Sequence, residues 1–256
     1  MTQLVGIDTI SIITAVYNRA DCIHLAMKSV QLQLYKYYEH VVIDGGSTDS
    51  TLKRVCDYAD YRTLLVSESD QGIYDAINKG IIRSSGEIIG LMHSDDVYAN
   101  KHVLTRVADA FADSDVDAVY GDVAFFHPQS PGKIIRRYRS DRFRPEMLDW
   151  GWMPAHTALF FRKRVFDQYG LYKIDYRIAA DFEFVARVFR SGRLRSIYLP
   201  EVLVHMSSGG ISTGGWRSTI LLNQEVLRAC RENNIDTNML KILTKYPLKA
   251  LEFLRS

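Results

Sequence analysis

The sequence predicts an α/β fold in which a mostly parallel central sheet carries helices on both faces. Three observations predict it. Short apolar runs alternate with stretches of helical periodicity over the first half of the chain, as buried parallel strands and their crossover helices do. Carboxylates follow three of the first four expected strands, at the positions where open α/β sheets bind ligands. The 256 residues are enough for one such domain with a full core.

The first half of the chain supplies five expected strands and the helices between them. The strands are short, often β-branched apolar runs, at residues 10–16, 40–44, 62–67, 87–92 and 117–121. Apolar residues at helical spacing predict helices at residues 23–34, 50–58, 72–83 and 103–111. Asp21 and Asn100 are expected to cap the first and the last of these helices.

The second half is less regular. Strands are expected at residues 152–161 and 194–200, and helices at residues 179–190 and 219–233. The polar segment 130–149 carries five crowded arginines, namely Arg136, Arg137, Arg139, Arg142 and Arg144. We interpret the arginine cluster, residues 136–144, as a solvated, mobile loop, or as a surface for an anionic acceptor or a lipid head group.

Composition excludes several classes of protein. A net charge of +2 does not indicate a dedicated nucleic-acid binder, so no nucleic-acid partner is expected. The three cysteines are odd in number and far apart, which favours free thiols in a reducing compartment. The first residues lack the pattern of a signal peptide, and no apolar run is long enough to span a bilayer. We therefore expect the protein in the cytoplasm or peripherally on the inner face of a membrane.

Asp95 and Asp96 are adjacent acids at the end of an expected strand. Holding two carboxylates together is costly unless a cation or hydrogen-bond donors compensate their charge. Oxygen ligands of this kind suit Mg²⁺ or Mn²⁺, with substrate phosphates completing the coordination shell. The alternative is a turn in which Asp95 caps the following helix. The residues alone favour neither reading.

Two further strand ends carry polar groups that a nucleotide could use. Asp44 is followed by Gly45 and Gly46, which let a ligand approach the backbone, and it can accept a hydrogen bond from a base or a ribose. Gly72 opens a helix whose free N–H groups favour an anion such as a diphosphate. For this helix alone, a simple solvated face is the better interpretation.

Asp181 stands in the first turn of an expected half-buried helix. Such an acid is usually a cap or a partner of the helix dipole, and pattern alone favours that role. Apolar surroundings would also raise its pKa and suit it to act as a general base. His156 and His205 are more often structural than functional. A glycine loop follows His205, which gives it the better functional case.

Six segments now form a recognisable series, namely SIITAVYN, VVIDGGSTDST, SESDQGIYDAINKGI, SGEIIGLMHSDDVY, HTALFFRK with IAADFEF, and GGIS. In this order and spacing they resemble the family 2 glycosyltransferases with the GT-A fold, over about residues 8–215. The resemblance implies an inverting transfer of a sugar from a nucleotide-sugar donor to a hydroxyl acceptor. It also implies a divalent metal, Mn²⁺ or Mg²⁺, as cofactor.

The resemblance also implies roles for single residues. On the donor side, Tyr17 and Asp44 would contact the nucleotide base, and Asp70 would lie near the uridine or its loop. Asp95 would contact the ribose or the metal shell, and Asp96 would coordinate the metal that bridges the donor diphosphate. UDP is the expected nucleotide.

On the acceptor side, the resemblance makes Asp181 the catalytic base. Gly209 and Gly210 of the GGIS loop would lie over the diphosphate or the acceptor, and His205 would assist there. The acceptor is expected to be a sugar or a lipid-linked molecule, in surface polysaccharide or glycolipid assembly, and the oligomeric state stays open.

The resemblance further implies a domain plan. Residues 1–215 would form the glycosyltransferase domain, with a nucleotide-sugar-binding half to about residue 122 and an acceptor half from about residue 123. Residues 216–256 would form a C-terminal helical extension. Its leucines and lysines, including Leu240, Lys241 and Leu248, would form a packing helix or a basic amphipathic helix on a membrane, and Pro247 interrupts the pattern.

The sequence departs from the family pattern at two places. His93-Ser94-Asp95 replaces the commoner Asp-x-Asp, which leaves the metal assignment open between Asp95 and Asp96. Gly215-Trp216-Arg217 stands where processive synthases carry Gln-x-x-Arg-Trp, so a single addition is expected. Two other functions compete with transfer. One is a nucleotidyltransferase, although AVYNRAD lacks the expected glycines, and the other is a non-catalytic nucleotide-sugar-binding subunit.

Overall fold

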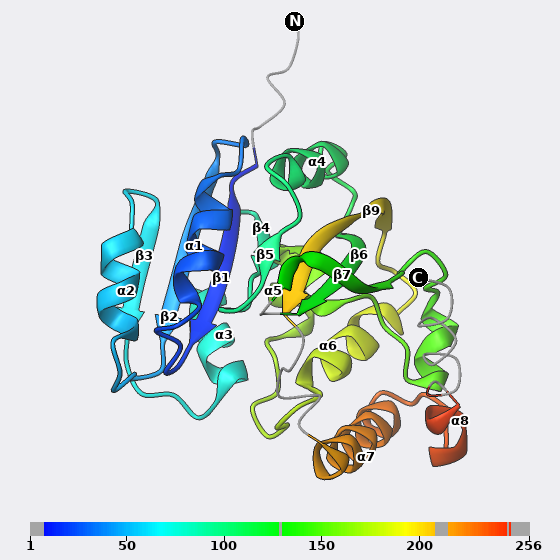
Figure 1. The fold of residues 1–256 in the computed structure, drawn as a ribbon. Helices are drawn as coiled ribbons and strands as arrows, with labels where there is room; N and C mark the ends of the chain where they lie inside the picture. Colours follow the sequence, from blue (N-terminus) through cyan, green and yellow to red (C-terminus); the bar gives the residue numbers. More distant parts are fainter. Residues whose placement is uncertain (1–7, 128–129, 208–214, 245, 247–256) are drawn as a thin grey trace, which may run out of the picture.

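The computed structural model describes residues 8–127, 130–207, 215–244 and 246, and the side chains of His127 and of residues 130–133 are not described. The described strands are β1 (Ile10–Val16), β2 (Tyr38–Asp44), β3 (Thr63–Ser67), β4 (Ile88–Leu91), β5 (Val97–Tyr98), β6 (Ala118–His127), β7 (Ser130–Tyr138), β8 (Leu159–Arg162) and β9 (Ser196–Ser207). They form one sheet in the order β3-β2-β1-β4-β8-β6-β9-β5, and β7 pairs with β6. Figure 1 shows this sheet running through the molecule.

The described helices are α1 (Ile23–Gln31), α2 (Thr51–Tyr58), α3 (Ile73–Arg83), α4 (Val103–Ala110), α5 (Lys163–Tyr169), α6 (Ala180–Phe189), α7 (Trp216–Glu232) and α8 (Met239–Leu243). Short 3₁₀ helices span Pro145–Trp150 and His156–Ala158. None of the helices in the described part of the chain has both the length and the apolar composition needed to cross a bilayer.

Strands β3, β2, β1 and β4 are parallel neighbours, as the alternation of apolar runs and helices predicts. The ends of β1, β2 and β3 are level, because Val16 pairs with Asp44 and Asp44 pairs with Ser67. The N–H of Met92, just past β4, donates to the carbonyl of Ile13 in β1 at 2.9 Å. The residues that follow these four strands therefore emerge at one edge of the sheet.

Alternate residues of the strands enter separate cores on the two faces of the sheet. Ile13 and Ile89 belong to one core with Ile77 of α3 and with most buried residues of α6. Ile12 and Ile88 belong to a second core with α4. α1 and α2 meet in a smaller cluster on β1 and β2. Helices thus cover both faces, and the predicted fold class is confirmed.

The second half of the sheet is mixed, which the sequence did not predict in detail. β8 runs antiparallel between β4 and β6, whereas β9 runs parallel to β6. The prediction of a strand over residues 152–161 is wrong for most of its length, since the segment enters a 3₁₀ helix and becomes strand only at Leu159. His156 therefore lies in that 3₁₀ helix. Residues 194–200 begin the much longer strand β9.

The reading of the arginine cluster as a loop is wrong for residues 136–138, and the polar segment 130–149 around it contains two regular elements. The first part is strand β7, which pairs with β6, and the last part is the 3₁₀ helix Pro145–Trp150. The expected caps are displaced as well. Cys22, rather than Asp21, occupies the cap position of α1, and His102 occupies that of α4. Asn100 instead accepts the N–H of His102 at 2.9 Å, so it orders the turn before the helix.

Candidate active site

Asp44 ends β2 and is fully buried. Its Oδ2 accepts hydrogen bonds from the N–H groups of Gly46 (3.1 Å) and Ser47 (3.0 Å) and from the hydroxyl of Ser67 (2.7 Å). Its Oδ1 is buried and has no hydrogen-bond partner among the described residues. Because a buried oxygen without a donor is costly, this atom marks a place where a ligand could donate a hydrogen bond.

Asp70 lies against the same turn. A β-carbon on Gly45 would stand 2.2 Å from Oδ2 of Asp70, so any larger residue there would displace the Asp70 carboxylate. The other oxygen, Oδ1, accepts the N–H of Gly72 at 2.8 Å just before α3. The carboxylates after β2 and β3 therefore share one edge of the sheet, as the strand ends predict.

The loop after β1 is tied to the loop after β2. Asn18 has φ of 50°, in the left-handed region that asparagine tolerates best among residues with a side chain. Its N–H donates to Ser47 Oγ at 2.8 Å, and its Oδ1 accepts the N–H of Thr48 at 2.9 Å. Asp49 accepts hydrogen bonds from the N–H groups of Thr51 and Ala20, so it shapes the loop. Tyr17 stands before Asn18 with 57% of its surface exposed.

Asp95 and Asp96 follow β4 but differ in environment. Asp95 is partly exposed, whereas Asp96 is 2% exposed. Oδ1 of Asp96 accepts the N–H of Ser207 at 3.1 Å, and Oδ2 is buried without a partner among the described residues. Burial, together with the charge of Asp95, raises the pKa of Asp96 well above its ordinary value. The positive charge of a bound cation would oppose that shift.

The described residues offer a metal ion few protein ligands. No group of three His, Cys, Asp or Glu side chains there is arranged to hold a metal ion. The unpaired oxygen of Asp96 and the adjacent carboxylate of Asp95 nevertheless fit a hard divalent cation, which commonly takes only one or two carboxylates from the protein and the rest from phosphates.

Asp181 lies in the first turn of α6, as predicted. Its Oδ1 accepts the N–H of Phe182 at 2.8 Å and lies 3.5 Å from the hydroxyl of Tyr74. Burial raises the pKa of Asp181 to about 6, while these donors and the nearby His93 act in the opposite direction. A carboxyl group with this pKa is largely ionised at neutral pH and can still bind a proton, which is what a general base requires.

His93 lies near both Asp95, which follows β4, and Asp181 of α6. Asp95 and Asp181 both influence its titration, and its ring lies 6.1 Å from that of His156. Burial and the neighbouring His156 lower the pKa of His93 to about 4, so both the ring and its partner are neutral at pH 7. His156 in turn contacts the Tyr172 hydroxyl at 3.0 Å.

The structure thus brings most of the predicted site residues together at the carboxyl edge of the sheet. Tyr17, Asp44 and Asp70 surround the ends of β1 to β3, and Asp95 and Asp181 share His93 as a neighbour. His205 lies in β9 opposite Val97, two residues before the strand ends at the Ser207 contact to Asp96. Gly209 and Gly210 lie outside the described residues.

Sequence reasoning missed Tyr74 and Tyr172, which contact Asp181 and His156, and Glu225, which accepts hydrogen bonds from the turn before α6. Tyr74 stands inside the SESDQGIYDAINKG segment, yet it has no charge to single it out. Glu225 falls three residues after Leu222, on the buried face of α7. An acid among the apolar positions of a helix is rarely buried without a partner, and this signal could have revealed it.

The arginine segment is mostly paired within the protein. Arg137 forms an ion pair with the buried Asp122 at 2.7 Å, and Arg139 pairs with Asp141 at 2.7 Å. Arg136 lies over the ring of Phe125. These contacts attach β7 to β6 and to the turn that follows it.

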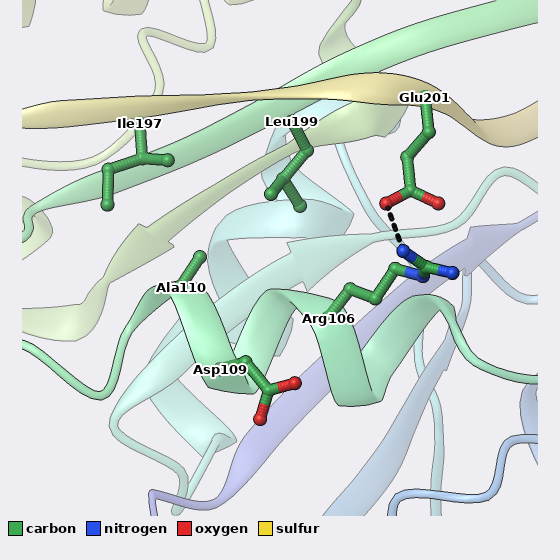
Figure 2. A pocket seen from close by; sticks show the side chains of 6 residues that line it. All are labelled: Arg106, Asp109, Ala110, Ile197, Leu199 and Glu201. Carbon is green, nitrogen blue, oxygen red and sulfur yellow. Dashed lines mark ion pairs between the residues drawn. The ribbon is translucent and has the colours of Figure 1, made fainter.

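A separate hollow of about 370 Å³ lies between α4 and β9. Figure 2 shows its lining, in which apolar Ile197 and Leu199 face α4 and the Arg106–Glu201 ion pair closes one side. In Figure 1, α4 lies near the end of the sheet at which β1 begins. The hollow is therefore at the opposite edge from the carboxylates.

Comparisons with known proteins agree with this arrangement. The profile described as "Glycosyl transferase family 2" matches residues 11–170. The PGL/p-HBAD biosynthesis glycosyltransferase of Mycobacterium bovis (strain BCG / Pasteur 1173P2) is 30% identical over 218 residues, which cover 79% of this chain and 78% of the relative.

Two solved structures share the fold. The mannosyltransferase PcManGT from Pyrobaculum calidifontis, in complex with GDP-Man and Mn²⁺, superposes with a TM-score of 0.69 at 21% identity, over 91% of this chain and 66% of that one. S. aureus TarS 1–349, in complex with UDP-GlcNAc, gives 0.68 at 18% identity, over 91% and 68%. From these matches and the site geometry, the chain belongs to glycosyl transferase family 2 and is a glycosyltransferase with the GT-A fold.

Proposed function

We propose that this enzyme moves one sugar from a nucleoside-diphosphate sugar, with UDP as the expected nucleotide, to a hydroxyl group of its acceptor with inversion at the anomeric carbon. The observation that carries the proposal is Asp181, a carboxyl with a pKa raised to about 6 beside His93, which in turn neighbours Asp95. Asp181 can take a proton from the acceptor hydroxyl, and the carboxylate of Asp95 can contribute to a cation site for the diphosphate. Together they suit a displacement reaction.

The nucleotide is proposed to bind over the ends of β1 to β3. Asp44 supports this role because its buried Oδ1 has no donor among the described residues and could accept from a base N–H or a ribose hydroxyl. Tyr17 is exposed beside it and offers a ring for stacking on the base. Asp70 would hold the turn or contact the ribose. PcManGT and TarS, which share the fold, bind GDP-Man and UDP-GlcNAc respectively.

Asp95 and Asp96 are the proposed protein ligands of Mn²⁺ or Mg²⁺. The unpaired oxygen and the raised pKa of Asp96 support this assignment, because both describe negative charge without compensation. The PcManGT structure contains Mn²⁺. When bound, the cation would supply positive charge against the leaving diphosphate.

In the proposed reaction Asp181 removes the proton from the acceptor hydroxyl as its oxygen forms a bond to the anomeric carbon. The bond from that carbon to the diphosphate oxygen breaks, and the nucleoside diphosphate leaves with the electron pair. The Phe182 N–H holds the base carboxylate in place. A neutral His93 keeps Asp181 basic, because a charged imidazolium there would lower the pKa of the carboxyl.

The acceptor is proposed to be a sugar or a lipid-linked molecule of surface polysaccharide or glycolipid assembly, met at the cytoplasmic face of a membrane. The name of the mycobacterial relative, a PGL/p-HBAD biosynthesis glycosyltransferase, supports a biosynthetic role of this kind. Gly209 and Gly210 would lie over the diphosphate or the acceptor. Exposed Leu240 and the neighbouring Lys241 are the described residues on which peripheral membrane contact would rest.

The test is calorimetric titration of the protein with UDP, GDP and TDP, each with and without Mn²⁺. We expect one nucleotide to bind, and to bind much more tightly with the metal. Asp96→Ala should lose the metal dependence, while Arg106→Ala, in the hollow away from the carboxylates, should keep it. Absence of binding by all three nucleotides under both conditions would contradict the proposal.

A further inference from the structure

Helix α6, which carries Asp181, lacks a cap of its own. Its cap residue is Ala179, whose side chain cannot accept a hydrogen bond. The turn before the helix presents three successive backbone N–H groups, from Arg177, Ile178 and Ala179. All three donate to one side chain, that of Glu225, at 2.8, 2.9 and 2.9 Å.

Glu225 reaches this turn from α7, 46 residues or more along the chain from its partners. It is 7% exposed, and among the described residues no lysine or arginine pairs with it. The three N–H groups and the adjoining N-terminus of α6 are therefore what compensates its charge. Charge-assisted bonds of this kind are about twice as strong as neutral ones, so the turn is firmly held.

The opposite side of the same turn is held by Tyr74. Its hydroxyl donates to the carbonyl of Ile178 at 2.5 Å and lies 3.5 Å from Oδ1 of Asp181. The turn is thus fixed through both its N–H groups and its carbonyl, only a few residues before the carboxyl that the reaction needs. Displacement of this turn would displace Asp181 and admit water around it.

We propose that Glu225 is a positioning residue for the transfer reaction, which holds the 177–179 turn so that Asp181 stays in place and stays half-buried. The inference rests on the proposed function for its catalytic consequence. Neither Glu225 nor Asp181 lies within residues 11–170, the part that the family profile matches. The chemistry at the sheet edge would therefore depend on α7, a helix outside the matched region.

Glu225→Gln is the sharpest perturbation. The amide has one oxygen in place of two, and its NH₂ group would face a backbone N–H, so at least one of the three bonds is lost. Glu232→Gln is the matched control on the same helix. Glu232 bonds the Tyr176 hydroxyl at 2.9 Å and Lys173 at 2.8 Å, but it does not contact the 177–179 turn.

The first readout is independent of activity. In protein labelled with ¹³C at the aspartate carboxyl, the Asp181 resonance is assigned by its absence in Asp181→Asn, and its titration is followed by NMR. In Glu225→Gln we expect the pKa of Asp181 to fall by about one pH unit toward its ordinary value, because water enters. Glu232→Gln should leave it unchanged. An Asp181 titration that is the same in wild type and Glu225→Gln would overturn the inference.

The second readout is turnover with the nucleotide sugar that binds. Glu225→Gln should lower kcat by about 10- to 100-fold, as a misplacement near 1 Å does, with little change in the KM for the donor. If Glu225→Gln does not fold, Glu225→Asp, shorter by one methylene, replaces it and should show the same changes at smaller size. A wild-type enzyme that transfers no sugar would count against the proposed function, while the NMR titration would still decide the role of Glu225.

Discussion

Replacement of Asp181 by asparagine tests two properties of this residue, the cost of its buried charge to stability and its role as the base. The folded protein raises its pKa from 3.8 to about 6, roughly two pH units. One pH unit corresponds to about 1.4 kcal/mol, so the charged carboxyl costs the fold at most about 3 kcal/mol. Because the side chain is partly exposed, solvent screening reduces this to about 1 kcal/mol.

The sign of the effect follows from the direction of the shift. Below pH 3.8 the carboxyl is protonated in both the folded and the unfolded chain, so it costs nothing. Between pH 3.8 and about 6 the unfolded chain gives up its proton first, and the cost builds up. Above about pH 6 the full cost is present. Asp181→Asn, which cannot ionise, should therefore be more stable than wild type at pH 7.5 and close to it at pH 4.

Thermal unfolding at the two pH values measures this difference. At pH 7.5 we expect the variant to melt about 2–4 °C above wild type, the shift that 1 kcal/mol produces in a chain of this size. The same variant should lose about 10²–10⁴-fold in kcat, while calorimetry shows nearly unchanged donor affinity. An equal melting difference at both pH values would refute the reasoning about burial. Weakened donor binding with normal turnover would refute the assignment as base.

Three further substitutions test other parts of the site and its support. Asp96→Ala should abolish both the Mn²⁺ response and donor binding, and an unchanged metal response in calorimetry would refute the proposed ligand. Gly45→Ala would place a β-carbon 2.2 Å from Oδ2 of Asp70, so nucleotide affinity should fall by about tenfold, about 1.4 kcal/mol, while melting changes little. Gly90→Ala would place one 2.4 Å from the buried ring of Phe160, and chemical denaturation should show a loss of about 1–3 kcal/mol.

The turnover of wild type should also depend on pH. Because the base must be ionised, kcat should rise with pH through a midpoint of about 6, the pKa of Asp181 in the folded protein. A pH–rate profile measured with saturating donor and metal checks this, and a profile that stays flat from pH 5 to pH 8 would contradict the role of Asp181.

The first half of the fold could be read from the sequence because its signals are local. β1 is a continuous β-branched run and was predicted to the residue, and the strands that end at Asp44 and Ser67 were predicted within two residues. In parallel strands both faces are buried, so the apolar run and its end coincide. The carboxylates at those ends could be placed at one edge for the same reason.

The second half was predicted poorly because its strands depend on distant partners. β7 is polar and rich in arginine, yet it forms because Arg137 pairs with buried Asp122 and the backbone completes the ladder with β6. The two-residue strand β5 exists only as a partner of β9. Propensity carries little information about such strands. Glu225 was missed for a similar reason, since its three donors are far away in the sequence.

The order of strands in the sheet has a practical consequence for anyone who shortens this protein. β6 lies between β8 and β9, and β9 is its parallel partner from the far end of the fold. Expression of residues 1–170 alone, the span in which the family profile ends, would remove β9 and leave β6 as a bare edge. An uncovered apolar edge strand is a template for aggregation. Screening of shorter expression boundaries should therefore begin beyond β9, with α7 retained.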